Sequence, residues 1–352
     1  MRAAVFAGPR SIQVADRPDP VAAAPTDAVV RVVLACVCGS DLWYYRGESP
    51  HALGPIGHEF VGVVEQVGER VRGIAEGNLV VAPFKYSDGT CANCRAGWTS
   101  SCVAGGAFGT DGFDGGQGQA VRVPFADATL VVVPGSGHSD ETMASVLALS
   151  DVMATGHHAA VSAGVRPGSV VAVVGDGAVG LCAVIAAARL GAARIIALSR
   201  NPARQVLARS FGATDVLPER GEEATEAVLE LTDGVGVDAA LECVGTAQSF
   251  TTAFSVARPG TTVGFVGVPH GIEVPIDTMF ARNIGLRGGV APARTYIPEL
   301  LDDVLERRIE PGRVFDFETD LEGVAEAYAA MDERRAIKSL LRVARSEKEM
   351  NR

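Results

Sequence analysis

Residues of the kinds that bind zinc occur where short apolar segments of the chain end. Cys38 stands in the run Cys38-Gly39-Ser40-Asp41, and His58 follows a loop rich in glycine and proline. A catalytic zinc site takes sulfur, nitrogen or oxygen from three protein ligands and keeps a further position open. Asp151 can supply the third ligand as a carboxylate oxygen. Each residue alone is ordinary, since a buried cysteine is usually a small apolar side chain, so the prediction depends on the other motifs.

A glycine motif marks a second chemical site. Val170–Val174 has the pattern of a strand, and it leads into the G-x-G-x-x-G sequence of Gly175, Gly177 and Gly180 and then into an apolar helix. Gly175 permits a tight turn, Gly177 lets the backbone approach a pyrophosphate, and Gly180 allows the helix to pack closely against the strand. The helix N-terminus adds positive potential. This context favours a dinucleotide site over a glycine-rich turn that has no ligand.

The end of the next predicted strand indicates which dinucleotide binds. An NAD site usually places an acid about 20 residues further on to hold the ribose hydroxyls, whereas the 2′-phosphate of NADP needs a cation. Ser199 stands where the acid is expected, and Arg200 follows it. We therefore predict NADP(H) in preference to NAD(H), with the phosphate bound by Arg200 and, as a second candidate, by Arg204. The alternative is that Arg200 is a solvent-exposed side chain without a ligand.

Two kinds of secondary structure must position these residues. The first half of the chain is a series of short β-type runs separated by Gly, Pro and Asp, which predicts an antiparallel β domain. From about Ser169 apolar strands alternate with helices, the pattern of βαβ units in a doubly wound parallel sheet. The predicted strands are 3–6, 28–34, 62–67, 79–82, 119–123, 129–133, 170–174, 194–198, 239–242, 262–266 and 313–317, and the predicted helices are 177–190, 202–211, 296–307 and 321–331.

Composition excludes several classes of function. The chain has 352 residues, enough for two domains. Its net charge of −11 would repel nucleic acid and anionic lipid, so neither is an expected partner. The most apolar stretch, 170–193, is interrupted by glycines and charged residues, which argues against a membrane span, and the N-terminus lacks the pattern of a signal peptide. We expect a cytoplasmic protein in which the seven cysteines serve as metal ligands or free thiols rather than disulfides.

Together these motifs resemble the zinc-dependent medium-chain alcohol dehydrogenases over nearly the whole chain. The resemblance is carried by the runs 38–41, 57–62, 151–157, 175–180 and 242–245. It implies an α/β protein with a GroES-like, β-rich catalytic domain, residues 1–151 and 288–352, and a Rossmann domain with a doubly wound parallel sheet, residues 152–287. It also implies that Cys38, His58 and Asp151 hold a catalytic zinc and that Glu59 is an alternate ligand.

The resemblance assigns roles to neighbouring residues. It implies that Ser40 passes the substrate proton into a relay and that Asp41 orients His58, as a carboxylate partner of a metal-bound imidazole does. Thr155 matches a residue that lies against the nicotinamide. The residues expected to line the substrate pocket are Trp43 and Phe84, with Phe108 and Phe113 as further candidates. The apolar residues expected to contact the cofactor are Val179, Val244 and Val268. The aromatic residues can equally belong to the core.

A second metal site is implied with one departure from the family pattern. Members of this family often carry a structural zinc on four cysteines spaced C-x2-C-x2-C-x7-C. This chain has Cys91, Cys94 and Cys102 at the last three positions but Asp88 at the first. A carboxylate can ligate zinc, so one aspartate and three cysteines can form such a site. The alternative is a lobe with reduced thiols and no metal.

The expected activity is hydride transfer between a small alcohol, or the corresponding aldehyde or ketone, and NADP(H). Polyol, sugar or amino-alcohol dehydrogenases of the same superfamily are the nearest alternative, because substrate pockets vary on one fold. A zinc-free quinone or enone reductase would not need the three ligands, and a non-catalytic NADPH-binding protein would not need a complete zinc site. The family usually forms dimers or tetramers, and the segments 283–287 and 263–268 resemble the strands that pair across its dimer.

Overall fold

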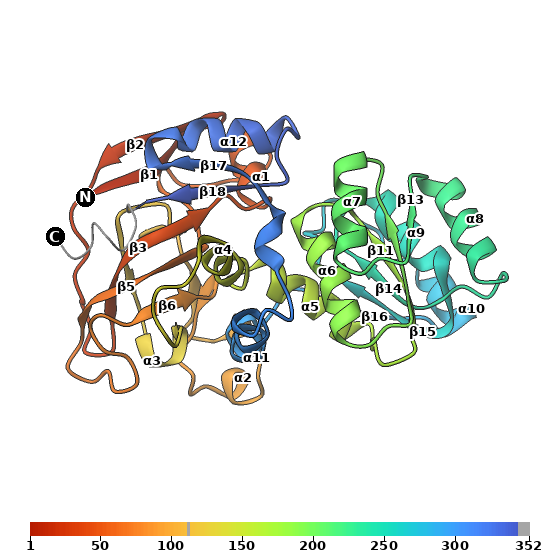
Figure 1. Cartoon of the computed structure of the whole chain (residues 1–352), viewed down its shortest axis with the longest axis horizontal. Helices are drawn as coiled ribbons and strands as arrows, with labels where there is room; N and C mark the ends of the chain where they lie inside the picture. Colours follow the sequence, from red (N-terminus) through yellow and green to blue (C-terminus); the bar gives the residue numbers. More distant parts are fainter. Residues whose placement is uncertain (111–112, 344–352) are drawn as a thin grey trace. The chain divides into compact units, whose positions relative to one another are not determined.

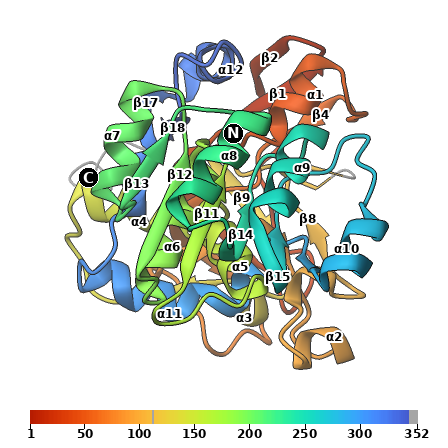
Figure 2. The ribbon, with the colours of Figure 1, turned by 90° about the vertical axis from the view of Figure 1, so that its right-hand side faces the viewer.

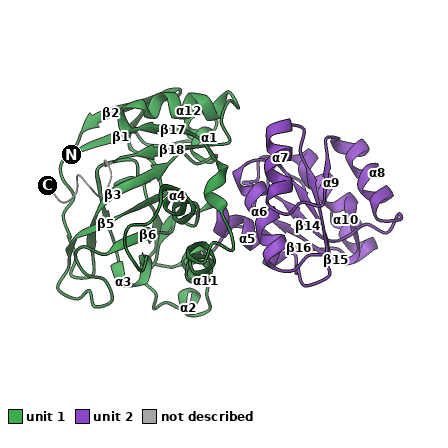
Figure 3. Cartoon of the chain, viewed as in Figure 1, with its two compact units in different colours: residues 1–151, 292–352 green, residues 152–291 purple. Residues whose placement is uncertain are grey.

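The computed structural model describes residues 1–110 and 113–343, and the chain divides into two compact units (Figure 3). Unit 1 comprises Met1–Asp151 and Pro292–Arg352, and unit 2 comprises Val152–Ala291. The second boundary expected from the sequence, between 287 and 288, falls inside strand β16 (Gly285–Gly288), which pairs with β15 (Ala257–Phe265). The division after Ala291 keeps that strand pair in one unit.

Unit 1 is rich in β structure (Figure 1). Its strands are β1 (Arg2–Gly8), β2 (Ser11–Asp16), β3 (Ala28–Cys36), β4 (Gly54–Pro55), β5 (Phe60–Val67), β6 (Leu79–Ala82), β7 (Lys85–Tyr86), β8 (Gly106–Ala107), β9 (Ala120–Val123), β10 (Val131–Val132), β17 (Phe315–Asp320) and β18 (Lys338–Arg342). The larger sheet runs β10-β6-β5-β3-β18-β17, with β9 also paired to β3, and smaller sheets pair β2-β1-β4 and β7-β8. The pairing is antiparallel, as predicted, except that β17 and β18 are parallel.

Two strands predicted for unit 1 are shorter in the structure, because helical turns occupy part of each predicted range. The helices of this unit are α1 (Asp41–Arg46), α2 (Ala92–Arg95), α3 (Ala126–Thr129), α4 (Asp140–Ala148), α11 (Ala293–Leu305) and α12 (Val324–Asp332), with 3₁₀ turns η1 (Thr99–Ser101), η2 (Pro311–Val314) and η3 (Leu321–Gly323). The predicted strand 129–133 is extended only at Val131–Val132, because the Thr129 hydroxyl bonds the Pro124 carbonyl at 2.9 Å and supports a helical turn. The predicted strand 313–317 begins later, at Phe315, because Pro311 starts a 3₁₀ turn.

Unit 2 contains one parallel sheet (Figure 2). Besides β15 and β16 its strands are β11 (Val170–Val174), β12 (Arg194–Leu198), β13 (Asp215–Leu217) and β14 (Val237–Glu242). They run in the order β13-β12-β11-β14-β15-β16, and each neighbouring pair is parallel, which confirms the predicted doubly wound sheet. Because β15 lies between β14 and β16, the expectation that 263–268 pairs across a dimer is wrong: backbone groups of this segment are already used within the chain. Only β16 presents an edge on that side.

Helices cover both faces of this sheet (Figure 1). They are α5 (Val152–Ser162), α6 (Ala178–Arg189), α7 (Pro202–Ser210), α8 (Gly221–Leu231), α9 (Ala247–Val256) and α10 (Ile276–Arg282). On one face α5 packs closely on α6 at Gly156, where a Cβ would lie 2.5 Å from the Ala183 nitrogen. On the other face α8 and α9 pack together. None of the helices in the described residues is long and apolar enough to cross a membrane.

Candidate functional site

The pairing of two strands brings Cys38 and His58 to one end of the larger sheet of unit 1. Ala35, near the end of β3, lies opposite Phe60, the first residue of β5. Cys38 follows β3 and His58 precedes β5, so the antiparallel register places both residues at the same end. This local geometry explains why two residues in separate loops can share one metal.

Asp151 completes the group from the turn that follows α4. The backbone N–H of Phe84, just after β6, donates to the carbonyl of Ser150 at 3.0 Å. β6 in turn pairs with β5. Asp151 Oδ2 lies 3.3 Å from Cys38 Sγ and 3.3 Å from His58 Nε2. One ligand atom from each of these residues and from Glu59 lies within 4.8 Å of the others. The predicted ligands therefore meet in the structure.

Asp41 and Ser40, at the start of α1, contact this group. Asp41 Oδ2 accepts the backbone N–H of Cys38 at 3.0 Å, and Oδ1 lies 3.4 Å from Nδ1 of His58. This contact leaves Nε2 of the ring facing Asp151, as the predicted orienting role requires. Ser40 Oγ donates to the Cys38 sulfur at 3.2 Å, so its hydroxyl lies beside the predicted metal ligands.

Lys338 is a residue of the site that the sequence interpretation missed. Its Nζ lies 2.7 Å from Glu59 Oε1 and donates to the Val37 carbonyl at 3.1 Å. Both charged side chains are fully buried, and the other oxygen of Glu59 has no hydrogen-bond partner among the described residues. A lysine inside the apolar run 336–341 was the available signal, because a buried lysine nearly always has a charged partner.

Tyr328 and Gln117 lie behind Asp41 and were also missed. The fully buried hydroxyl of Tyr328, on α12, lies 3.0 Å from Gln117 Oε1 and 3.5 Å from Asp41 Oδ2. Gln117 Nε2 donates to the Cys36 carbonyl at 2.9 Å. The Gln117 side chain fills the space beside Gly57, where a Cβ would lie 2.4 Å from its Cγ and where φ is +88°. Gly57 is therefore required by both the turn and the packing behind the site.

The donor set fits zinc. Burial, together with the Asp151 and Glu59 carboxylates, raises the pKa of the Cys38 thiol to about 11. Burial opposes the charged form of His58, but Asp41 and the other anionic neighbours outweigh it and raise the pKa of His58 well above its usual value. A divalent cation that bound here would displace the proton of the Cys38 thiol. A thiol, an imidazole and a carboxylate, with an unpartnered Glu59 oxygen beside them, form the ligand chemistry of catalytic zinc.

The second predicted metal group also converges. One ligand atom each from Asp88, Cys91, Cys94 and Cys102 lies within 4.8 Å of the others, and all the cysteines are free thiols. Backbone N–H groups of Cys91 and Thr90 hold the Asp88 carboxylate and lower its pKa to about 2. Burial raises the pKa of Cys94 to about 12. An ionised carboxylate beside one buried and two half-buried thiols fits a cation better than it fits an apolar lobe.

Each glycine of the dinucleotide motif has the geometry that its predicted role needs. Gly175, directly after β11, has φ of +122°, and a Cβ there would lie 2.7 Å from Val244. A Cβ at Gly180 would lie 2.0 Å from the Gly175 carbonyl oxygen, so only glycine lets α6 start this close to the strand. Gly177 caps α6, and nothing lies within 4 Å of its Cβ position. The strand order reverses between β11 and β14, the switch point at which such sheets bind ligands.

The three residues predicted to select the dinucleotide lie at the end of β12 and the start of α7. Ser199 Oγ donates to Asp176 Oδ2 at 2.9 Å. Arg204 Nη1 lies 3.4 Å from Asp176 Oδ1, so this guanidinium is paired. Arg200 is exposed. Asp176, the residue between the first two glycines, is therefore a carboxylate at the place where a phosphate was expected.

The other predicted cofactor residues surround the same end of the sheet or lie on the helices beside it. Val244 and Val268 follow β14 and β15 and are 42% and 50% exposed. Val179 lies in the first turn of α6, and Thr155 is buried on α5. The Glu242 carboxylate, which was given no role of its own, accepts the Val244 N–H at 2.9 Å. Burial raises the pKa of Glu242, and this residue shapes the loop that carries Val244.

Of the aromatic residues predicted to line the substrate pocket, some lie near the site and others in the hydrophobic core. Phe84 lies against His58, with ring centroids 6.2 Å apart. Trp43 lies on α1, two residues after Asp41. Phe108 is 1% exposed and belongs to the hydrophobic core of unit 1, so its candidacy for the substrate pocket is wrong, and Phe113 packs against the same core. Aromatic residues in a glycine-rich loop can fold inward, which the local sequence pattern does not reveal.

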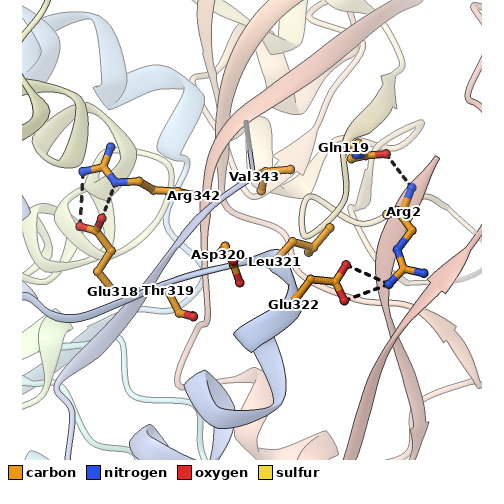
Figure 4. Close-up of a pocket in the computed structure, with 9 residues that line it drawn as sticks. All are labelled: Arg2, Gln119, Glu318, Thr319, Asp320, Leu321, Glu322, Arg342 and Val343. Atoms are coloured by element: carbon orange, nitrogen blue, oxygen red, sulfur yellow. Dashed lines mark hydrogen bonds and ion pairs between the residues drawn. The ribbon is translucent and has the colours of Figure 1, made fainter. Parts of the chain in front are cut away.

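A polar pocket of about 480 Å³ opens elsewhere on unit 1 (Figure 4). Its two guanidinium groups already have partners, because Arg2 Nη2 lies 2.8 Å from Glu322 and Arg342 pairs with Glu318. The residues that line it include none of the predicted ligands. We assign no ligand to this pocket, since both of its cationic groups are paired within the chain.

The fold and the two ligand groups define a zinc-binding dehydrogenase of two units. Residues 24–135 match the model of the alcohol dehydrogenase GroES-like domain, and residues 178–306 match that of the zinc-binding dehydrogenase domain. A zinc-type alcohol dehydrogenase of Aspergillus flavus is 34% identical over 338 residues, which cover 93% of this chain and 78% of that protein. The chain belongs to the zinc-dependent medium-chain dehydrogenase family.

Solved structures agree with this assignment. The alcohol dehydrogenase of a Thermus species is 34% identical, with a TM-score of 0.90 over 98% of this chain and 100% of that chain. A protein described as a zinc-binding dehydrogenase from Sinorhizobium meliloti, solved with NADP bound, is 25% identical, with a TM-score of 0.81 over 97% of this chain and 99% of that chain. The family and the fold class predicted from the sequence are confirmed.

Proposed function

We propose that this protein is a zinc-dependent alcohol dehydrogenase that transfers a hydride between a primary or secondary alcohol, or the corresponding aldehyde or ketone, and NADP(H). The observation that carries the proposal is the convergence of Cys38, His58 and Asp151 on one point. The complete ligand set argues against a zinc-free reductase and against a non-catalytic dinucleotide-binding protein, because neither needs it. The similarity to alcohol dehydrogenases of other organisms supports alcohol chemistry.

The residues of the proposed site have different chemical roles. Bound zinc supplies a Lewis acid that polarises an alcohol or carbonyl oxygen, and the bound dinucleotide supplies the hydride carrier. Cys38, His58 and Asp151 would hold the metal, and Asp41 keeps the imidazole oriented through Nδ1. The Ser40 hydroxyl, 3.2 Å from the Cys38 sulfur, would accept the proton of a substrate hydroxyl while it passes its own proton on through a relay to solvent, and the reverse transfer would supply the proton in the reducing direction.

The preference for NADP(H) rests on the end of β12. Ser199 replaces the acid of an NAD site, and the exposed Arg200 would bind the 2′-phosphate. The Sinorhizobium meliloti protein, solved with NADP, supports this choice. We expect the wild type to oxidise NADPH faster than NADH with a panel of aldehydes and ketones. Arg200→Ala should raise the KM for NADPH about tenfold or more and leave the KM for NADH unchanged; equal effects on both would overturn the assignment.

A structural zinc on Asp88, Cys91, Cys94 and Cys102 forms part of the proposal. The four ligand atoms lie within 4.8 Å of one another, and the sulfur of Cys91 caps α2 by accepting the Cys94 N–H. A closed set of four ligands leaves no open position for a substrate. The role of this zinc would be to stabilise the lobe between β7 and β8.

The edge of the parallel sheet supports a homo-oligomer, either a dimer or a tetramer built from dimers. β16 is the last strand on its side of the sheet, and an unpaired edge is a template for strand pairing. Just before it in the chain, Phe280 and Ile276 on α10 are 88% and 64% exposed. Sedimentation should show a dimer or tetramer for the wild type and a smaller species for Phe280→Glu. A monomeric wild type would contradict this proposal.

A further inference from the structure

The dinucleotide end of unit 2 holds a carboxylate that neither the motif nor the proposed function uses. Asp176 fills the variable position between Gly175 and Gly177, and its side chain turns toward the end of β12. Oδ2 accepts the Ser199 hydroxyl at 2.9 Å, and Oδ1 lies 3.4 Å from Arg204 Nη1. Arg204 also donates to the Asp176 backbone carbonyl at 3.3 Å. Ser199 and Arg204, one of the two arginines expected to bind the 2′-phosphate, therefore already contact one acid.

Burial and further hydrogen bonds fix the contacts of Asp176 with Ser199 and Arg204. The Asp176 and Arg204 side chains are only 16% and 14% exposed. Asn201 caps α7 by accepting the Arg204 N–H at 3.2 Å, and Gln205 Nε2 donates to the Ser199 carbonyl at 2.7 Å. The backbone on which Ser199 and Arg204 stand is thus fixed, and the ion pair between Asp176 and Arg204 is part of the fold of this loop.

A carboxylate here has opposite effects on the two dinucleotides. In an NAD site the acid that binds the ribose hydroxyls comes from the end of the second strand. Here Ser199 stands at that position, and Asp176 brings a carboxylate to within 2.9 Å of its hydroxyl. A carboxylate accepts hydrogen bonds from a 2′-hydroxyl, but it opposes a 2′-phosphate because two negative groups a few ångströms apart disfavour each other. It also holds Arg204, which leaves Arg200 as the exposed cation.

We propose that Asp176 is a specificity-determining residue that weakens the preference for NADP(H) and lets the protein also accept NAD(H). It does so by opposing the 2′-phosphate, by retaining Arg204 in an ion pair and by offering an acceptor to the 2′-hydroxyl of NAD(H). This inference rests on the proposed function, which places the 2′-phosphate beside Arg200 and Arg204.

Calorimetric titration of the full-length protein with NADP⁺ and NAD⁺ tests this proposal without any need for catalysis. Asp176→Asn keeps the shape and removes the charge, so it should bind NADP⁺ about tenfold more tightly, the effect of removing one nearby like charge, and NAD⁺ more weakly. Asp176→Ser should shift the ratio of the two Kd values in the same direction, and it carries the test if the asparagine variant does not fold. The control Glu226→Gln removes an exposed charge from α8 of the same unit and should change neither Kd.

Other results would overturn either the role of Asp176 or the NADP(H) assignment. If the aspartate variants leave the ratio of Kd values unchanged, or weaken NADP⁺ binding, Asp176 organises Ser199 and Arg204 for the phosphate, and the proposal is overturned. The ratio is compared with that of the wild type, so it decides the role of Asp176 whichever dinucleotide the wild type prefers. A wild type that prefers NAD⁺ and is insensitive to Arg200→Ala would instead overturn the NADP(H) assignment.

Discussion

Asp41 Oδ1 lies 3.4 Å from Nδ1 of His58. The other oxygen of the same carboxylate accepts the backbone N–H of Cys38 at 3.0 Å, so one side chain at the start of α1 positions two of the proposed metal ligands, which lie in separate loops after β3 and before β5. Tyr328 lies behind this carboxylate, with its hydroxyl 3.5 Å from Asp41 Oδ2. The geometry of the proposed ligand group therefore depends on side chains that are not themselves proposed ligands.

Asp41→Asn should weaken zinc binding by about 10- to 100-fold, the usual effect of removing an orienting partner of a metal-bound histidine. Competition with a chelator of known affinity measures the change. Asp302→Asn, which removes an exposed acid from α11 of the same unit, should bind zinc as the wild type does. Unchanged zinc affinity in Asp41→Asn would show that the contact with His58 has no orienting role.

Lys338→Met should destabilise the protein strongly. The change leaves Glu59 fully buried without its cationic partner at 2.7 Å, and breaking a buried ion pair on one side costs about 3–5 kcal/mol. Urea denaturation of the metal-free protein measures the free energy of unfolding. The double variant Lys338→Met with Glu59→Gln should recover much of the loss, because no charge is then left unpaired. Wild-type stability in the single variant would contradict this reading of the pair.

Cys91→Ser should remove the structural zinc and leave the catalytic zinc in place. The cysteine lies in the group of Asp88, Cys94 and Cys102, whose ligand atoms lie within 4.8 Å of one another. Zinc content should fall by about one equivalent per subunit, and Tm should fall because a structural zinc contributes folding free energy. Cys182→Ala, a buried thiol on α6, is the control and should lose no zinc. Equal zinc content in Cys91→Ser and the wild type would rule out this second site.

Asp332 should contribute a pH-dependent part of the stability. Burial opposes its ionisation, but Arg46 and Arg10, at 2.5 and 3.0 Å, outweigh burial and lower the pKa of Asp332. A folded pKa below the unfolded one means that this stability is fully present above the unfolded value, about 3.9, and is lost as the pH falls through the folded value. Asp332→Asn should cost about 1–3 kcal/mol at neutral pH.

Urea denaturation at a series of pH values checks this prediction. The gap in the free energy of unfolding between the wild type and Asp332→Asn should narrow once the pH falls below about 4. A gap that stays constant down to acid pH would show that the carboxylate charge of Asp332 contributes nothing.

Local patterns predicted the elements that carry the motifs, and long-range pairing decided the rest. Strands such as β11 and β12 were predicted at their observed bounds, because a short apolar run between turn signals has one plausible structure. Lys338 was missed because it reaches the site through β18, which pairs with β3 although the paired residues are about 300 positions apart. Tyr328 was missed because it contacts Asp41 from α12, an element equally distant in the sequence. Asp176 was missed because its position in the motif accepts any residue. Its role became visible only when the structure placed it beside Ser199 and Arg204.

The zinc content of the wild type and of Cys38→Ser, measured per subunit by plasma mass spectrometry, tests whether Cys38, His58 and Asp151 form a catalytic metal site. The variant should hold about one equivalent less zinc than the wild type and should lose alcohol dehydrogenase activity, because three protein ligands define such a site. A wild type whose zinc does not depend on Cys38, yet which still oxidises NADPH with aldehydes, would contradict the metal mechanism and favour a zinc-free reductase.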